Sequence, residues 1–243
     1  MNKILLFICC LIPAIVKCQL KGKYIGADGI PGNLEIHDLS GNPIPIGDHS
    51  NFEGSPFLQN NFTYAVIKLK NGSMLSDAHV NYSLYNEKLF FSRNDKIYPV
   101  QNSVTEFLLR NGQDKDTSTV YHFQNGFPAI NKHDTSTFYQ LVWAGNNLQF
   151  LKWLHKDVKE VYNYNGPIKN QYILDERFFV FLPLENRMVE IGGIISLNQL
   201  RKKFPEYSKQ LVDYNTDHKI SWKNYSDLIQ LFSFLDSIKR KSP

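Results

Sequence analysis

The chain has 243 residues, of which 42% are hydrophobic and 21% charged, and its formal net charge is +4. A chain of this length can bury a sizeable core without disulfides. The weak positive balance does not favour a nucleic-acid partner, because nucleic-acid binders usually carry a clustered basic face. The two short basic runs, Arg201–Lys203 and Lys239–Lys241, lie near the ends of predicted helices, where cations interact favourably with the helix dipole.

The first 18 residues have the pattern of a secretory signal peptide. Lys3 supplies a positive charge, an apolar run from Ile4 to Val16 follows, and a cleavage site fits between Cys18 and Gln19. The run is too short for a comfortable membrane span, which needs about 20 apolar residues. We therefore expect residues 1–18 to be removed and the mature chain, without a transmembrane span, to be secreted or periplasmic.

All three cysteines lie within this segment, at Cys9, Cys10 and Cys18. Cleavage after Cys18 leaves a mature chain with no disulfide, no thiol nucleophile and no thiolate metal site. The alternative is a lipid anchor on Cys18, although Lys17 fits poorly before an anchored cysteine.

Residues 19–57 are predicted to be an irregular N-terminal segment, because glycine and proline recur throughout it. Residues 58–192 follow as an antiparallel β domain with period-two alternation and turn signals, the strongest being Asn71-Gly72. Strands are predicted at 62–70, 74–85 (with room for a bulge), 88–92, 96–100, 104–110, 119–124, 137–144, 148–154, 171–183 and 188–191.

Three segments of this domain carry further expectations. The run Phe178–Leu182 is apolar throughout and predicts a strand buried on both faces. Lys156–Tyr164 fits either a strand or a short helix. The alternating basic residues of Leu151–Lys159 predict a solvated basic strip on one strand face.

From Ser196 the hydrophobic period becomes helical. Ser196 with Gln199 fits a capping box, and Asn224 with Asp227 marks a second helix start. The last helix has one apolar stripe, formed by Leu228, Leu231, Phe232, Leu235 and Ile238. We predict an α+β fold, mainly β, in which an antiparallel meander sheet or open barrel is followed by helices at 193–243 that pack on the sheet.

Motifs for common catalytic, cofactor and metal sites are absent, so the sequence predicts no catalytic residue, no cofactor and no metal. The weak candidates for a binding site are of two kinds. His122 and His133, with Asp134, flank a predicted turn, where a polar turn explains them equally well. Aromatic residues could line a groove for a glycan or a peptide, or fill the core; they are Phe127, Trp143 and Trp153.

Several short stretches resemble those of a set of uncharacterised secreted proteins common in Bacteroidota. The stretches are Gly54–Phe57, Leu89–Phe91, Ile97–Pro99, Val104–Phe107, Gly126–Pro128, Thr137–Tyr139 and Ser226–Ile229. The resemblance implies export and a shared fold. It implies no activity and carries over no site residue.

The expected function is therefore that of an exported, non-enzymatic cell-envelope protein that binds an envelope protein or a glycan. Two alternatives stay open. One is a hydrolase with a dispersed acid/base site, which would need paired carboxylates in a cleft. The other is an envelope structural protein.

Overall fold

The computed structural model describes residues 52–93, 96–101, 103–110, 120–162 and 168–238. The predicted signal peptide and most of the segment predicted to be irregular lie outside the described residues. The strands are β1 (Phe52–Glu53), β2 (Thr63–Leu69), β3 (Met74–Ser83), β4 (Lys88–Arg93), β5 (Lys96–Pro99), β6 (Val104–Arg110), β7 (Val120–Gln124), β8 (Tyr139–Ala144), β9 (Gln149–Val161), β10 (Lys169–Leu182) and β11 (Arg187–Gly192). The helices are α1 (Leu197–Lys203), α2 (Ser208–His218) and α3 (Tyr225–Ser237), with short 3₁₀ turns at Pro183–Glu185 and Pro205–Tyr207.

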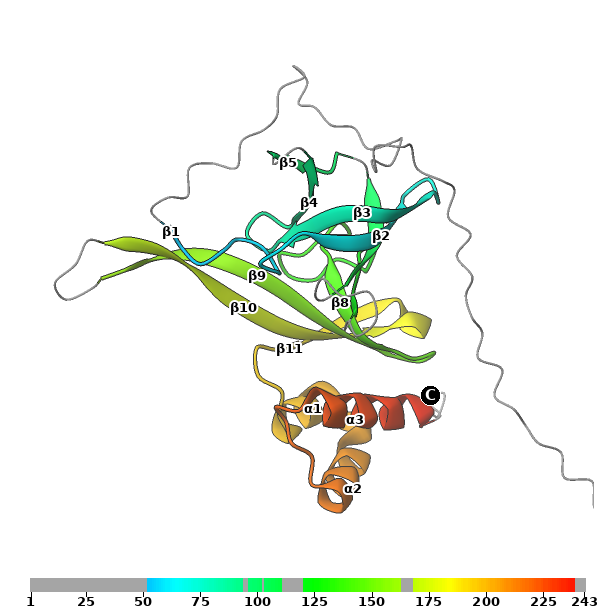
Figure 1. Ribbon diagram of the computed structural model, residues 1–243. Coiled ribbons are helices and arrows are strands. Elements are labelled where there is room, and N and C mark those ends of the chain that lie inside the picture. Colours follow the sequence, from blue (N-terminus) through cyan, green and yellow to red (C-terminus); the bar gives the residue numbers. More distant parts are fainter. Residues whose placement is uncertain (1–51, 94–95, 102, 111–119, 163–167, 239–243) are drawn as a thin grey trace, which may run out of the picture.

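The strands form one open, mixed sheet in the order β1-β10-β9-β8-β7-β6-β2-β3-β4-β5, and β11 pairs with β10 beyond the end of β1. All pairs are antiparallel except the short β1–β10 pair. This confirms the predicted mainly β fold with C-terminal helices (Figure 1). The order departs from a simple meander at two points, because β6 pairs with β2 and not with β5, and β1 pairs with β10.

Local sequence signals account for the first hairpin. Residues of β2 alternate between buried and exposed, as the period-two pattern predicts. Gly72 takes a φ of +83°, which the Asn71-Gly72 turn requires and which glycine adopts without cost. The predicted bulge is confirmed by a register shift between Ala65 and Ile67, opposite Asp77, whose φ is +61°.

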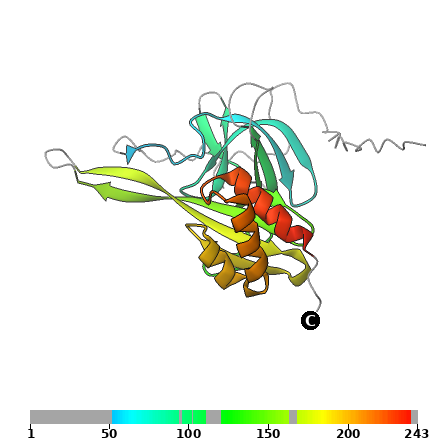
Figure 2. The ribbon, with the colours of Figure 1, turned by 90° about the horizontal axis from the view of Figure 1, so that it is seen from below.

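The longest hairpin is the β9–β10 ribbon, which projects beyond the rest of the sheet in Figure 2. Lys156–Val161 is confirmed as strand, continuous with the strand predicted at 148–154. The prediction for Phe178–Leu182 is also confirmed, since all but Phe181 are buried. The predicted basic strip is wrong, because Lys152 is buried and Lys156 donates two hydrogen bonds of 2.7 Å, to the backbone oxygens of Ser55 and Phe57.

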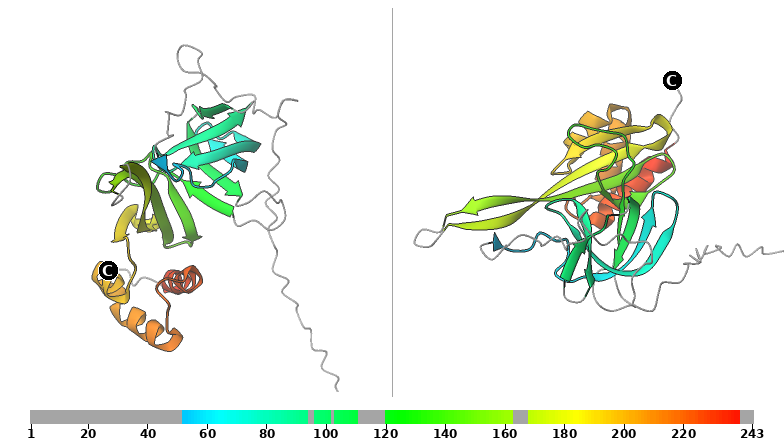
Figure 3. Two further views of the ribbon diagram at one scale, coloured as in Figure 1. Left: turned by 60° about the vertical axis from the view of Figure 1, so that its left-hand side comes forward. Right: turned by 90° about the horizontal axis from the view of Figure 1, so that it is seen from above.

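The buried side chains form three clusters. One lies between the helices and strands β9–β11 and contains Phe150, Val180, Leu211 and Phe232. The helices gather on one side of this part of the sheet, while strands β2–β5 lie on the other side of the molecule (Figure 3). The second cluster fills the space among β2, β3, β4, β6 and β7, and the third, smaller one surrounds Trp153.

Two of the helices, α1 and α3, begin at the predicted caps. The Ser196 hydroxyl accepts a hydrogen bond from the Gln199 backbone N–H, and the Asn224 side chain accepts one from the Ser226 backbone N–H. Four residues of the predicted stripe of α3 are buried against the sheet, namely Leu228, Leu231, Phe232 and Leu235, while Ile238 is the C-cap residue and is partly buried. Within the described ranges, no helix has the length and apolarity needed to cross a lipid bilayer.

Candidate functional site

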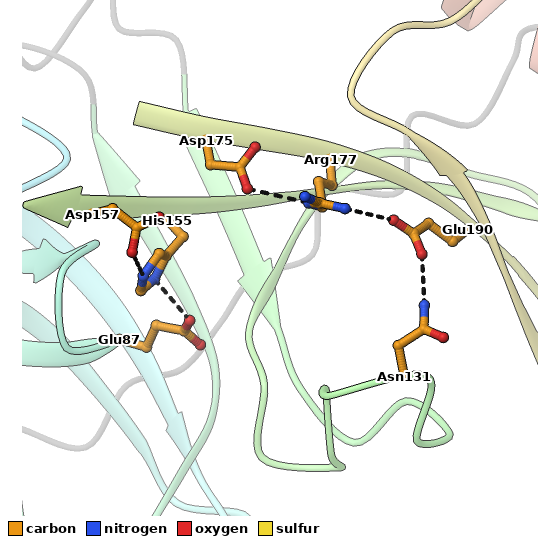
Figure 4. A network of polar contacts seen from close by, with 7 residues as sticks. All are labelled: Glu87, Asn131, His155, Asp157, Asp175, Arg177 and Glu190. Carbon is orange, nitrogen blue, oxygen red and sulfur yellow. Dashed lines mark hydrogen bonds and ion pairs between the residues drawn. The ribbon is translucent and has the colours of Figure 1, made fainter. Parts of the chain in front are cut away.

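Seven polar side chains from five separate segments lie on one face of the β9–β10 ribbon in two neighbouring sets of contacts, and we call this group the ribbon network (Figure 4). Its members are Glu87, Asn131, His155, Asp157, Asp175, Arg177 and Glu190. Glu87 lies in the β3–β4 turn, Asn131 in the β7–β8 loop and Glu190 on β11, and the remaining members lie on β9 and β10.

Strand register explains why these residues share a face. His155 of β9 is the cross-strand partner of Asp175 on β10, and Trp153 is the partner of Arg177. Because side chains alternate along a strand, these residues point to the face opposite the helices. The β3–β4 turn reaches the same place, since the backbone N–H of Lys156 donates to the backbone oxygen of Leu84 at 3.0 Å.

His155 lies between two carboxylates. Its Nδ1 is 3.1 Å from Oε1 of Glu87, and its Nε2 is 3.4 Å from Oδ1 of Asp157. The imidazole stacks on the Trp153 ring with centroids 5.1 Å apart and planes within 5°. The ring is thus held from both edges and one face, which fixes the direction of its two nitrogen atoms.

Glu87 is held in an unusual environment. Its φ of +55° places a non-glycine residue in the left-handed region. Burial raises the pKa of the Glu87 carboxyl, while His155, the indole N–H of Trp153 and Lys132 act to lower it. The buried N–H of Trp153 is close enough to the Glu87 carboxyl to affect its pKa, although the two groups do not meet hydrogen-bond geometry.

Arg177 organises the other half of the network. Its Nε lies 3.2 Å from Oδ2 of Asp175, and its Nη1 lies 3.2 Å from Oε1 of Glu190. The second oxygen of Glu190 accepts a 2.6 Å hydrogen bond from the Asn131 amide. The Glu190 carboxylate thereby connects β10, β11 and the β7–β8 loop.

The third hydrophobic cluster lies beneath the network and consists of Phe127, Tyr139, Leu151, Trp153, Phe179 and Met188. His133 is buried beside it, with Nδ1 2.8 Å from the Tyr139 hydroxyl and its ring centroid 4.6 Å from that of Trp153. Burial lowers the pKa of His133, and the nearby positive charge of Lys132 lowers it further. The Lys132 Nζ lies 5.4 Å from the centroid of the Trp153 ring.

The structure brings three of the sequence candidates together and separates the others. Phe127, His133 and Trp153 belong to this one region. His122 instead pairs with Glu106 at 2.7 Å on the β6–β7 pair.

The two remaining candidates have local structural roles. Asp134 is exposed and accepts hydrogen bonds from the backbone and hydroxyl of Ser136, in an Asx turn. Trp143 packs against the cluster beneath the helices.

The charged members of the network were not predicted from the sequence. The available signal was the run Asp175-Glu176-Arg177, three charges within a strand whose other residues are largely apolar. Their partners Glu87 and Glu190 could not be found in the same way, because they come from distant turns and strands.

The geometry of the network is suited to charge recognition and proton transfer. Within the part of the chain that the structure describes, no group of three or more His, Cys, Asp or Glu side chains is placed to hold a metal ion. An open depression of about 350 Å³ lies at the β2–β3 turn, lined by Leu69, Lys70, Asn71 and Ser103, and the network does not contribute to it.

Comparison of the chain with protein-family models, with curated proteins and with solved structures finds no match. The resemblance to secreted Bacteroidota proteins therefore stays a prediction.

Proposed function

We propose that this protein is an exported, non-enzymatic protein of the cell envelope that binds a partner through the ribbon network. The observation that carries the proposal is the gathering of charged, partly exposed side chains on a continuous two-stranded support. The exposed fraction of the side chain is 61% for Asp157, 38% for Asp175 and 22% for Glu190. Exposed charge on a rigid element suits recognition.

The charge of the network favours a basic partner. Four carboxylates face two permanent cations, Arg177 and the neighbouring Lys132, so the formal charge is −2 while the histidines are neutral. The whole chain is positive, at +4. A local negative patch on a positive protein can direct a lysine- or arginine-bearing surface to this face.

A glycan is less well supported as the ligand. Sugar recognition commonly uses exposed aromatic rings as flat, rigid contact surfaces. Trp153 is only 2% exposed, and Phe127 is buried as well. We therefore choose a protein or peptide partner with basic side chains.

The test measures binding of a fluorescent oligolysine peptide to the full chain by anisotropy, with an oligoglutamate peptide as the opposite probe. The double variant D157N/D175N removes two of the four carboxylates and should weaken oligolysine binding roughly tenfold, at about 0.7 kcal/mol per charge. The matched control is D213N/D217N, which makes the same change in net charge at exposed positions of α2.

The two double variants separate a site from a general charge effect. Wild type and control should bind oligolysine equally, and added salt should weaken both, since the Debye length is about 10 Å at 0.1 M. Equal losses in the two double variants, or a preference of the wild type for oligoglutamate, would contradict the proposal.

One observation favours the hydrolase as a second candidate. A carboxyl whose pKa is raised by burial, next to a histidine, is a suitable acid/base pair. Turnover of chromogenic ester, phosphate or glycoside substrates that is lost in both E87Q and H155Q, but kept in H122Q, would establish this function in place of binding. His122 is the matched control because it also pairs with a glutamate, away from the network.

A further inference from the structure

The β7–β8 loop, residues 125–138, supplies Phe127 to the third hydrophobic cluster, and three consecutive side chains further along the loop contact the same region. Asn131 donates to Glu190, Lys132 lies over the Trp153 ring, and His133 contacts the Tyr139 hydroxyl. The loop keeps its shape through paired backbone hydrogen bonds between Ile130 and His133, of 2.9 and 3.0 Å. The backbone N–H groups of Ile130 and His133 are therefore protected while this turn stays packed on the cluster.

His133 is the most deeply placed of the three. Its ring centroid lies 4.6 Å from that of Trp153, 5.3 Å from that of Phe179 and 5.6 Å from that of Tyr139. This position suits a neutral imidazole, because a charge there would be largely removed from water. The His133 side chain thus holds the loop against the aromatic cluster only in one protonation state.

The charged groups around His133 come from every neighbouring element. Lys132 and Asp134 flank it on the loop, His155 lies on β9, Arg177 on β10 and Glu190 on β11. Glu190 is the carboxylate that would stabilise a protonated His133, but both of its oxygens already bind, one to Arg177 and one to Asn131. The β3–β4 turn adds only Glu87, which pairs with His155.

We propose that His133 is a pH-operated latch: its protonation releases residues 130–134 of the β7–β8 loop from the third hydrophobic cluster and uncovers the rings of Trp153 and Phe179. Release of the loop also breaks the Asn131–Glu190 hydrogen bond and so alters the ribbon network. The latch goes beyond the proposed binding function and is measured without any partner. The latch and the binding function can therefore be refuted independently.

The sign of the effect follows from linkage. Burial lowers the pKa of His133 in the closed loop below its ordinary value of 6.5. The closed state is therefore favoured above about pH 6.5, and this contribution is lost as the pH falls towards the lower, closed-state pKa. Because one proton is taken up, the opening equilibrium should rise by at most about tenfold per pH unit in this range.

Hydrogen exchange of the full chain tests the latch. Protection factors, corrected for intrinsic exchange rates, are compared between about pH 7.5 and about pH 5. In the wild type the backbone amides of Ile130 and His133 should lose protection, by at most about tenfold per pH unit below about pH 6.5, while the Leu151 amide in β9 keeps its protection. The variant H133N, which is uncharged at both pH values, should show no such loss, and the control H122N should behave as wild type.

NMR titration of the His133 ring gives a second measurement that needs no variant. Its midpoint, the closed-state pKa, should lie below about 6.5, and the loss of loop protection should begin near pH 6.5 and be complete near that midpoint. Three results would overturn the latch: unchanged protection of the loop at low pH, simultaneous loss of protection in β9, or the same pH dependence in H133N. A His133 titration that occurs without any change in loop protection would do so too.

Discussion

The carboxylate of Asp236 should be a principal link between the last helix and the sheet. It lies at the end of α3 and accepts backbone N–H groups from the β8–β9 turn, from Asn147 at 2.6 Å, Leu148 at 2.9 Å and Asn146 at 3.3 Å. In return, the Asn147 amide donates to the backbone oxygen of Asp236 at 2.8 Å. We predict that D236A loosens the attachment of α3 and lowers the free energy of unfolding.

The magnitude follows from the two short bonds. A hydrogen bond to a charged group contributes about 1.5–3 kcal/mol, and the lower value applies here because the group is only partly buried, which gives about 3 kcal/mol for the two. A carboxylate near a helix C-terminus is unfavourable by about 0.5 kcal/mol, and D236A removes this cost. The expected net loss is about 2.5 kcal/mol, or roughly 5–10 °C in Tm for a domain of this size.

Urea unfolding at neutral pH, followed by circular dichroism, measures this loss. D236N keeps one uncharged acceptor and should lose about 1 kcal/mol. The control D213A removes an exposed aspartate of α2 and should change stability by no more than about 0.5 kcal/mol. A loss in D236A no larger than that in D213A would refute the assigned role of the turn contacts.

Three further predictions concern other parts of the fold. G145A places a methyl group against the Trp143 ring and 2.5 Å from Cγ of Asp236, and should cost about 1–3 kcal/mol in urea unfolding, with a smaller cost in the D236A background. K156M removes the two hydrogen bonds to the backbone oxygens of residues 55 and 57; it should cost about 1–3 kcal/mol and speed proteolytic cleavage near residue 55, and unchanged cleavage would contradict this. Burial raises the pKa of Glu87 above 4.5. The contribution of the protonated Glu87 carboxyl to stability is therefore full below that pH and is lost as the pH rises through the folded-state pKa. Unfolding measured from pH 4 to 7 should show the wild type losing stability relative to E87Q as the pH rises.

Local signals were sufficient for most elements of the fold. The Asn71-Gly72 turn, the alternation of β2 and the cap at Ser196 each depend on residues near one another in the chain, and each is confirmed. The pairing of β6 with β2 depends on contacts between distant residues, and period-two alternation says nothing about which strands become neighbours. The mixed strand order was for this reason beyond a sequence-based prediction.

The wrong expectation for the basic residues of β9 has a similar cause. Lys152 and Lys156 do lie on one face, as their spacing indicates, but other elements cover that face. Lys152 donates to the Tyr225 hydroxyl at 3.1 Å and lies 4.9 Å from the centroid of that ring. The long apolar stem of a lysine allows such burial when the ammonium group finds partners.

The same limit explains what was found and missed at the site. His133 and Trp153 were candidates because histidine and tryptophan are common in binding sites. The importance of Glu87 depends instead on a turn that reaches His155 of β9 from 68 residues away in the sequence. Asp175 and Arg177 are visible in the sequence as charges within an apolar strand. Their role depends on the register that places them opposite His155 and Trp153.

The central part of β9 faces the core with one side and the candidate site with the other. Phe150 faces α3, with its ring 4.2 Å from that of Phe232, while Trp153 and His155 face the network. Because the two faces alternate along one backbone, a change that loosens α3 should also alter the position of the network side chains. Asp236 contacts no member of the network. If the network is the binding surface, D236A should therefore weaken oligolysine binding through this shared strand, and D213A should leave the binding unchanged.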